Sequence, residues 1–227
     1  MADHELLPFL QAYLTATSLE EKDRLLCRMR RLVESVPARK EFEAAEKSLA
    51  AKDLDSCIIH LQRAIHFYDA FPRAYTMLGG AYAQEQKFSD AEAALQKAIQ
   101  LDPKGAAAYI QLGATYNQMK KYPEAEKALN QGLQIDPNAA AAHYEIAKTL
   151  MALGRWQDAE PHAVKALAAL PDVPPLHVVM GNIFLKKRDA PAALQEFQQY
   201  LKLDPNGSMA PAVRDVVAKI QSALGTH

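Results

Sequence analysis

Apolar and polar residues follow the period of an amphipathic helix along most of the chain, and one arrangement of them returns at a fixed interval. Apolar or small residues stand at positions i, i+3, i+4 and i+7, which share one face of a helix. These residues are Tyr75, Leu78, Gly79 and Tyr82 in one segment, Tyr109, Leu112, Gly113 and Tyr116 in the next, and His177, Met180, Gly181 and Phe184 further on. The pattern predicts helices whose small residue lets a neighbouring helix approach closely.

A second apolar stripe follows each of these sets, so the predicted helices come in pairs. Each pair ends at a proline, which has no N–H to donate and restricts the residue before it. The dipeptides that carry these prolines are Asp102-Pro103, Asp136-Pro137, Leu170-Pro171 and Asp204-Pro205, each 34 residues from the next. Pro123 and Pro191 instead fall where the second helix of a pair should begin, a place where proline is tolerated.

Four segments, 72–105, 106–139, 140–173 and 174–207, align with one another without gaps. They resemble the tetratricopeptide repeat, a helix–turn–helix unit of 34 residues with a W-x2-L-G-x2-Y…A-x3-F…P pattern. The chain departs from that pattern by placing tyrosine or histidine where the family favours tryptophan. The residues concerned are Tyr75, Tyr109, His143 and His177. The resemblance implies an all-α protein, a right-handed α-solenoid of such repeats, and core packing for the two histidines.

The segment 38–71 is interpreted as a degenerate first repeat, because Ala45, Cys57 and Ala64 fall on its small positions whereas Glu41 departs from the aromatic one. Residues 1–37 are predicted to form an N-terminal helical hairpin, with leucine stripes at Leu6, Leu7 and Leu10 and again at Leu25, Leu26, Leu32 and Val33. This hairpin caps the first repeat, serves self-association or is an independent docking element. Ser18 and Glu21 have the spacing of a capping box.

Residues 208–227 are predicted to form a C-terminal capping helix with Ser208 at its start. Its apolar stripe is Val213, Val216, Val217, Ile220 and Leu224. A solenoid exposes an apolar face at its last repeat, and one extra amphipathic helix covers such a face.

Composition narrows the function classes. The formal net charge is −1 and charges of both signs are interspersed, so Arg28, Arg30 and Arg31 are interpreted as a solvated helix face and nucleic acid is not expected as a partner. Cys27 and Cys57 are too few for a disulfide framework. The start of the chain lacks the pattern of a signal peptide, and no apolar run suits membrane insertion. A cytoplasmic protein is expected.

Catalytic and metal chemistry is not expected. Cys57, His60 and His66 share one predicted helix, but their spacing matches no common zinc pattern. Glu43 and Glu46 lie three residues apart, whereas a catalytic carboxylate pair needs a closed cleft. Phosphate-binding loops, nucleophile elbows and HExxH motifs are absent from the sequence. We therefore expect no enzyme activity, no cofactor and no metal.

The resemblance implies that the first helices of successive repeats line a concave groove, which holds an extended peptide or a partner helix. The residues expected to face it are Arg73, Met77, Ile110, Gln111, Asn117, Tyr144, Glu145, Lys148, Val178, Asn182 and Lys186. Amide side chains there can donate to and accept from a peptide backbone. Ile110, Tyr144 and Val178 exposed in a row would be costly unless a ligand covers them, or unless they pack against a neighbouring repeat.

The leading hypothesis is a non-catalytic scaffold or adaptor, monomeric, that binds a protein or peptide of unspecified identity. The alternative is a chaperone-like protein that shields a client and forms a homodimer through residues 1–37. A third is a structural module held by its ends. The carboxylate clamp that binds heat-shock chaperones is not expected, because its positions hold residues such as Met77, Gln111, Ala141 and Glu145.

Overall fold

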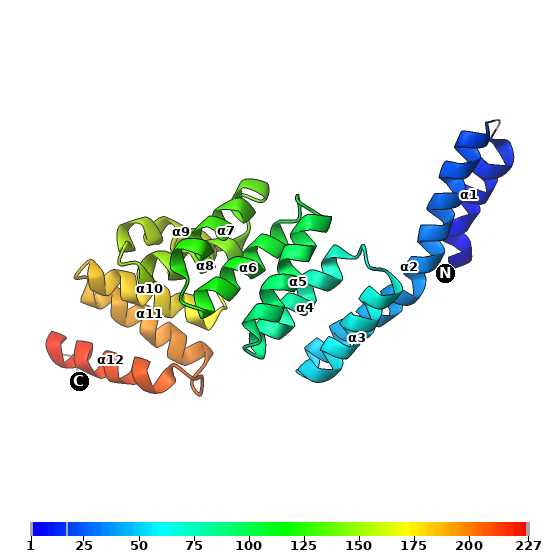
Figure 1. Ribbon diagram of the computed structural model, residues 1–227. Helices are drawn as coiled ribbons and strands as arrows, with labels where there is room; N and C mark the ends of the chain where they lie inside the picture. The colour runs from blue at the N-terminus through cyan, green and yellow to red at the C-terminus, as the bar shows by residue number, and fades with distance from the viewer. Residues whose placement is uncertain (1, 17, 226–227) are drawn as a thin grey trace. The chain divides into compact units, whose positions relative to one another are not determined.

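The computed structural model describes residues 2–16 and 18–225, and the side chains of all of these except 2–7, 10, 19, 23 and 27–34. Every regular element in this part of the chain is an α-helix, as predicted (Figure 1). In chain order they are α1 (Ala2–Thr15), α2 (Leu19–Ala50), α3 (Leu54–Phe67), α4 (Pro72–Gln84), α5 (Phe88–Leu101), α6 (Ala106–Gln118), α7 (Tyr122–Ile135), α8 (Ala140–Ala152), α9 (Trp156–Ala169), α10 (Pro174–Lys186), α11 (Ala190–Leu203) and α12 (Ala210–Leu224). Across the described residues, no helix combines the length and the apolar character that crossing a bilayer requires.

From α2 to α11 the helices pack in five consecutive pairs. They are α2 with α3, α4 with α5, α6 with α7, α8 with α9, and α10 with α11. Pro123 and Pro191 lie in the first turns of α7 and α11, as expected. The chain divides into two compact units, Met1–Pro103 with α1 to α5 and Lys104–His227 with α6 to α12.

Glycine allows the two helices of a pair to approach closely, as the sequence predicted. A Cβ atom added at Gly79 would lie 2.5 Å from Leu95 Cγ, and one added at Gly113 would lie 2.4 Å from Leu129 Cγ. The same relation holds at Gly181, where the nearest atom of Phe197 would be 2.7 Å away. Leu95, Leu129 and Phe197 of the second helices occupy the space beside these three glycines.

Each unit has its own buried core. In the first unit it joins α2, α3, α4 and α5, and its centre includes Phe42, Cys57 and Leu61. In the second unit one cluster includes Leu129 and Ile146. A further cluster of the second unit includes Phe197 and Tyr200 of α11. Cys57 is fully buried in this way, and Cys27 lies outside the described side chains.

The N-terminal region departs from the expected hairpin in one respect. α1 packs along α2, and Ser18 caps α2 by accepting a hydrogen bond from the Glu21 backbone N–H at 3.1 Å. α2, however, continues from Leu19 to Ala50 and thus crosses the expected boundary at residue 37. Pro37 removes one backbone hydrogen bond from this helix without ending it. One helix therefore spans both the predicted hairpin and the start of the segment interpreted as the first repeat.

Several expectations for this region fall on side chains outside the described residues. They concern Leu6, Leu7, Leu10, Arg28, Arg30, Arg31, Leu32 and Val33.

The C-terminal helix α12 packs against α11, and Val213 and Ile220 are buried between them. Leu224, the last residue of the predicted stripe, is exposed. The expected cap at Ser208 is wrong, because the N-cap is Met209 and its side chain makes no capping hydrogen bond. The first turn of α12 is therefore stabilised by burial of the apolar face of the helix, and not by a capping side chain.

Candidate functional site

In the second unit the first helices of successive pairs form a continuous surface. α6 packs against α8 and α8 against α10, whereas no comparable packing joins α7 with α9 or α9 with α11 in the described part of the chain. The row α6–α8–α10 is thus the more closely spaced side of the stack. We call the surface of these three helices the first-helix face.

Nine of the predicted groove residues lie on α6, α8 and α10. Gln111, Asn182 and Lys186 are exposed, and the others are half-buried: Ile110, Asn117, Tyr144, Glu145, Lys148 and Val178. For two of the three apolar side chains, the alternative of packing against a neighbouring repeat applies. Ile110 packs against the core cluster that contains Ile146, and Val178 packs against the cluster that contains Phe197.

Asn117 links α6 to α8 through both atoms of its amide. Its Nδ2 donates to the backbone carbonyl of Glu145 at 3.1 Å and to Glu145 Oε2 at 2.9 Å. Its Oδ1 accepts from the Thr149 hydroxyl at 2.8 Å. Asn117 is therefore a structural link between neighbouring repeats, and it is not free to pair with a peptide backbone as expected.

Lys148 and Tyr144 continue this cluster on α8. Lys148 Nζ lies 2.9 Å from both carboxylate oxygens of Glu145, and 4.9 Å from the centre of the Tyr144 ring. Burial raises the pKa of the Tyr144 phenol to about 12, and the charge of Glu145 acts in the same direction. Tyr144 is therefore neutral at physiological pH and presents a ring with a hydroxyl at this surface.

The two remaining predicted residues, Arg73 and Met77, lie on α4 in the first unit. Met77 is half-buried against the core of that unit. Arg73 is exposed and lines a pocket of about 350 Å³ that the sequence pattern does not predict. The pocket is lined by Ser35, Arg39, Phe42, Glu43, Glu46, Tyr68, Phe71 and Arg73.

Aromatic rings form the apolar part of this pocket. The ring centres of Phe42 and Phe71 are 5.0 Å apart, and those of Tyr68 and Phe71 are 6.3 Å apart. Phe42 lies in α2, within the segment 38–71 that was interpreted as a degenerate repeat, and no groove residues were predicted there. A large aromatic residue one place after Glu41 was the signal that could have identified it.

Three helix pairs hold a titratable side-chain pair at equivalent places, with one residue on each helix. His60 Nδ1 lies 2.6 Å from Glu41 Oε2, and His177 Nδ1 lies 2.7 Å from Glu196 Oε2. In the pair between them, His143 Nδ1 lies 2.8 Å from His162 Nδ1. His143 and His177 are buried, which agrees with the expected core role.

The cysteine and histidines considered for metal binding have other surroundings. The Cys57 thiol is buried, and burial raises its pKa. His60 is bound to Glu41 on the neighbouring helix, away from any common zinc arrangement. Within the described residues, no three His, Cys, Asp or Glu side chains come together as a metal site would require.

Comparison with known protein families identifies the repeats. Two family models, both described as tetratricopeptide repeat, match this chain. One matches residues 82–148 and 118–161, and the other matches residues 144–208. The search of curated proteins finds no match.

Solved structures with the same fold cover most of the chain. A thermophilic TPR protein of Thermus thermophilus is 18% identical, with 82% of this chain and 98% of that chain covered and a TM-score of 0.64. PilF of Pseudomonas aeruginosa is 16% identical, with coverages of 84% and 91% and a TM-score of 0.70. YrrB, described as a TPR protein with an unusual peptide-binding site, is 15% identical, with coverages of 80% and 92% and a TM-score of 0.56.

Proposed function

Because this chain belongs to the tetratricopeptide repeat family, we propose that it is a non-catalytic interaction scaffold that binds a peptide segment or partner helix on its first-helix face. Proteins of this family act in general as protein-binding modules. The peptide-binding site described for YrrB, a structure of the same fold, supports a peptide as the ligand class. Catalysis plays no part in this proposal.

The chemical character of the first-helix face carries the proposal. α6 contains no charged residue, and the two charges of α8, Glu145 and Lys148, neutralise each other. Only Lys186 adds a charge on α10. Tyr144 and the exposed amides Gln111 and Asn182 therefore dominate a surface suited to a mostly uncharged backbone and apolar side chains.

We further propose the division of the chain that the repeats suggest. It comprises an N-terminal hairpin (1–37), a degenerate repeat (38–71), four regular repeats (72–105, 106–139, 140–173 and 174–207) and a C-terminal capping helix (208–227). The continuity of α2 means that any movement of the hairpin is transmitted to the degenerate repeat.

Affinity capture from a native lysate, followed by mass spectrometry, tests the first-helix face. Gln111→Arg/Asn182→Arg adds two cations to exposed positions of α6 and α10, and we expect it to lose a partner that the wild-type chain captures. Ile110→Asp is less suitable, because Ile110 packs against the core. The matched control is Asn130→Arg/Gln195→Arg, at exposed positions of the second helices α7 and α11.

The control variant should retain the partner, and circular dichroism should show that both variants are folded. A partner kept by the Gln111→Arg/Asn182→Arg variant and lost from the control would place binding on the second helices and contradict the proposal.

One observation favours the chaperone-like alternative, in which two copies pair through residues 1–37. Leu14 and Leu26 of the N-terminal hairpin have 79% and 45% of their surface exposed. A second copy would bury such leucines. Size-exclusion chromatography with light scattering would then show a dimer that Leu14→Glu/Leu26→Glu converts to a monomer, while the control Leu153→Glu remains dimeric. A wild-type monomer would exclude this alternative.

A further inference from the structure

We propose that the pocket of the first unit receives the guanidinium or ammonium group of an arginine or lysine side chain from the bound polypeptide. This inference rests on the proposed function only in that the cation belongs to a protein ligand. The pocket lies wholly within the first unit, between α2, the α3–α4 connection and α4. It is therefore separate from the first-helix face of the second unit.

The aromatic rings provide the surface that a cation prefers. The faces of aromatic rings carry negative charge density and attract a guanidinium or ammonium group within about 6 Å of the ring centre. Phe42 is buried and held in place by the core, so its ring is fixed. Phe71 and Tyr68 stand beside it at the distances given above and are half-buried. A volume of about 350 Å³ admits the end of one long side chain.

The guanidinium group of Arg73 already lies over the Phe42 ring, as the cation of a ligand would. Its guanidinium carbon lies 5.0 Å from the centre of the Phe42 ring, and its Nη2 lies 3.6 Å from Glu46 Oε1. The Arg73 side chain is 74% exposed, and an exposed ion pair of this length contributes little to stability. Arg73 can therefore leave at small cost when the cation of a ligand arrives.

The charges at the rim favour a cation over an anion. Glu43 lines the pocket and, among the described residues, has no hydrogen-bond or ion-pair partner. Arg39 already has an interaction within the chain, and Arg73 is paired with Glu46. An incoming cation thus finds an open carboxylate, whereas an incoming carboxylate meets ring faces whose negative charge density repels it.

The test uses the full chain labelled with carbon-13 in its phenylalanine rings, and follows the ring signals by NMR at low salt. The probe is N-acetyl-arginine methylamide, and its matched control is N-acetyl-citrulline methylamide, which has nearly the same shape and no charge. We expect the arginine compound to shift the Phe42 and Phe71 signals in a saturable manner and the citrulline compound to leave them in place. Equal shifts with both compounds, or none with either, would overturn the proposal.

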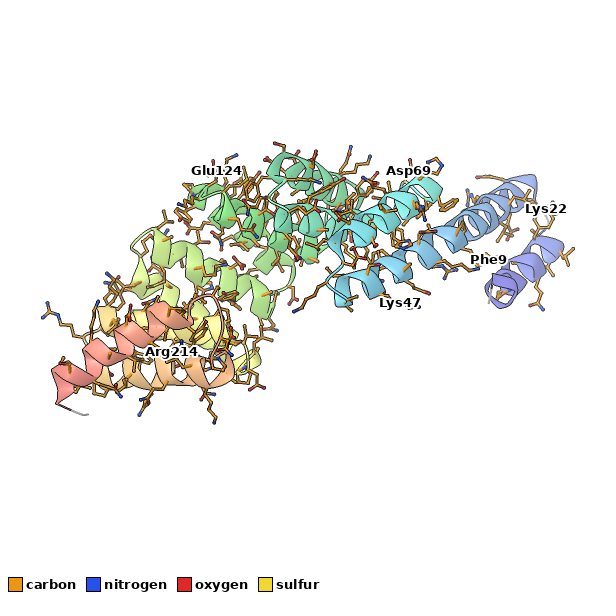
Figure 2. All side chains as sticks on the ribbon, turned by 90° about the horizontal axis from the view of Figure 1, so that it is seen from below. Phe9, Lys22, Lys47, Asp69, Glu124 and Arg214 are labelled. Carbon is orange, nitrogen blue, oxygen red and sulfur yellow. The ribbon has the colours of Figure 1, made fainter. Side chains whose placement is uncertain are left out.

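Two variants give opposite expectations. Glu43→Gln should weaken binding of the arginine compound by about three- to fivefold, because it removes the open carboxylate. Arg73→Ala should strengthen it by a similar factor, because it vacates the Phe42 ring. The matched control Glu124→Gln, at an exposed position of α7 in the second unit, should leave the affinity unchanged (Figure 2).

Weaker binding by Arg73→Ala would show that Arg73 itself holds the ligand, and would overturn the inference. The capture experiment alters only the second unit, so the two results can be separated. Partner loss there, with no arginine binding here, would leave the scaffold function standing and remove the cation pocket.

Discussion

At the scale of single residues, close contacts between helices and buried polar pairs contribute to the stability of this protein. His143 shows both effects. Its Nε2 lies 3.0 Å from the Pro137 carbonyl oxygen, which can only accept, so Nε2 donates and Nδ1 accepts from the Nδ1–H of His162. His177 is placed in the same way, with Nε2 2.9 Å from the Pro171 carbonyl oxygen and Nδ1 2.7 Å from Glu196 Oε2.

The lowered pKa of His162 predicts that the folded chain loses stability in acid. Burial is the main cause that lowers the pKa of His162, followed by His143 of α8 and Lys165 of α9, while Asp158 of α9 opposes them. α10, which also packs against α9, adds no charge to this set. The folded chain therefore binds a proton on His162 less readily than the unfolded chain, whose histidine pKa is about 6.5. The neutral His162 therefore contributes its full stabilisation of the folded chain above the unfolded pKa. This contribution is lost as the pH falls through the lowered pKa of His162 in the folded chain.

Urea unfolding at several pH values checks this, with the fluorescence of Trp156, the single tryptophan, as the probe. His162→Gln keeps a donor for His143 and cannot titrate. Its free energy of unfolding should fall less than that of the wild type between pH 7 and pH 5. Parallel pH profiles for the two proteins would contradict the prediction.

The close approach at Gly113 predicts a cost for one added methyl group. Gly113→Ala would place Cβ 2.4 Å from Leu129 Cγ and 3.2 Å from the backbone oxygen of Ala125. We expect the free energy of unfolding to fall by about 1–3 kcal/mol, because the helices or Leu129 must shift. In a double-mutant cycle with Leu129→Ala, the combined loss should be smaller than the sum of the single losses. An additive cycle would show that this contact is not the cause.

At the scale of secondary structure, the turns between the two helices of each pair share one feature. In each of five helix pairs the turn holds one residue with a positive φ angle: Lys52, Gln86, Lys120, Gly154 and Arg188, which are 34 residues apart. Glycine occupies only one of these positions. Composition therefore gave no sign of the left-handed conformation, which the packing of the two flanking helices imposes on lysine, glutamine and arginine.

Gly154→Ala isolates the energetic cost of that conformation. Gly154 has a φ of +76°, and an added Cβ would meet no atom within 4 Å. We expect a loss of about 1 kcal/mol in the free energy of unfolding, caused by backbone strain alone. Lys120→Gly, with φ of +59° in the wild type, should not destabilise the protein by the usual cost of glycine, because it relieves the same strain. Chemical unfolding measures both; an unchanged Gly154→Ala would disprove the argument.

At the scale of the whole molecule, the chain is a set of repeats grouped into two compact units. Each helix pair buries its apolar face against its neighbours, so stability arises from contacts between adjacent elements. The core clusters of α6 to α12 draw their residues from the second unit alone. In the first unit, α2 continues without a break from the predicted N-terminal hairpin into the segment interpreted as the first repeat.

This division predicts that residues 104–227 fold without the rest of the chain. Their two core clusters are complete within the fragment, and the fragment retains Trp156 as a probe. We expect a helical circular dichroism spectrum and a cooperative transition in urea. A fragment that lacks a cooperative transition would show that the second unit depends on α1 to α5.

The sequence by itself determined the helices, their pairing and the close contacts at Gly79, Gly113 and Gly181, because these depend on a local period and on prolines that recur with the repeat. It also indicated the family, and it assigned most of the predicted groove residues to α6, α8 and α10. Tertiary structure alone decided that Asn117 is bound to Glu145, that Ile110 is half-buried, and that Phe42, Tyr68 and Phe71 surround a pocket. In these cases the interacting groups come from different helices, and a periodic pattern specifies which face is buried without specifying which side chains meet across it. The same reason explains α2, whose continuation through Pro37 is supported by its packing against α1 and α3.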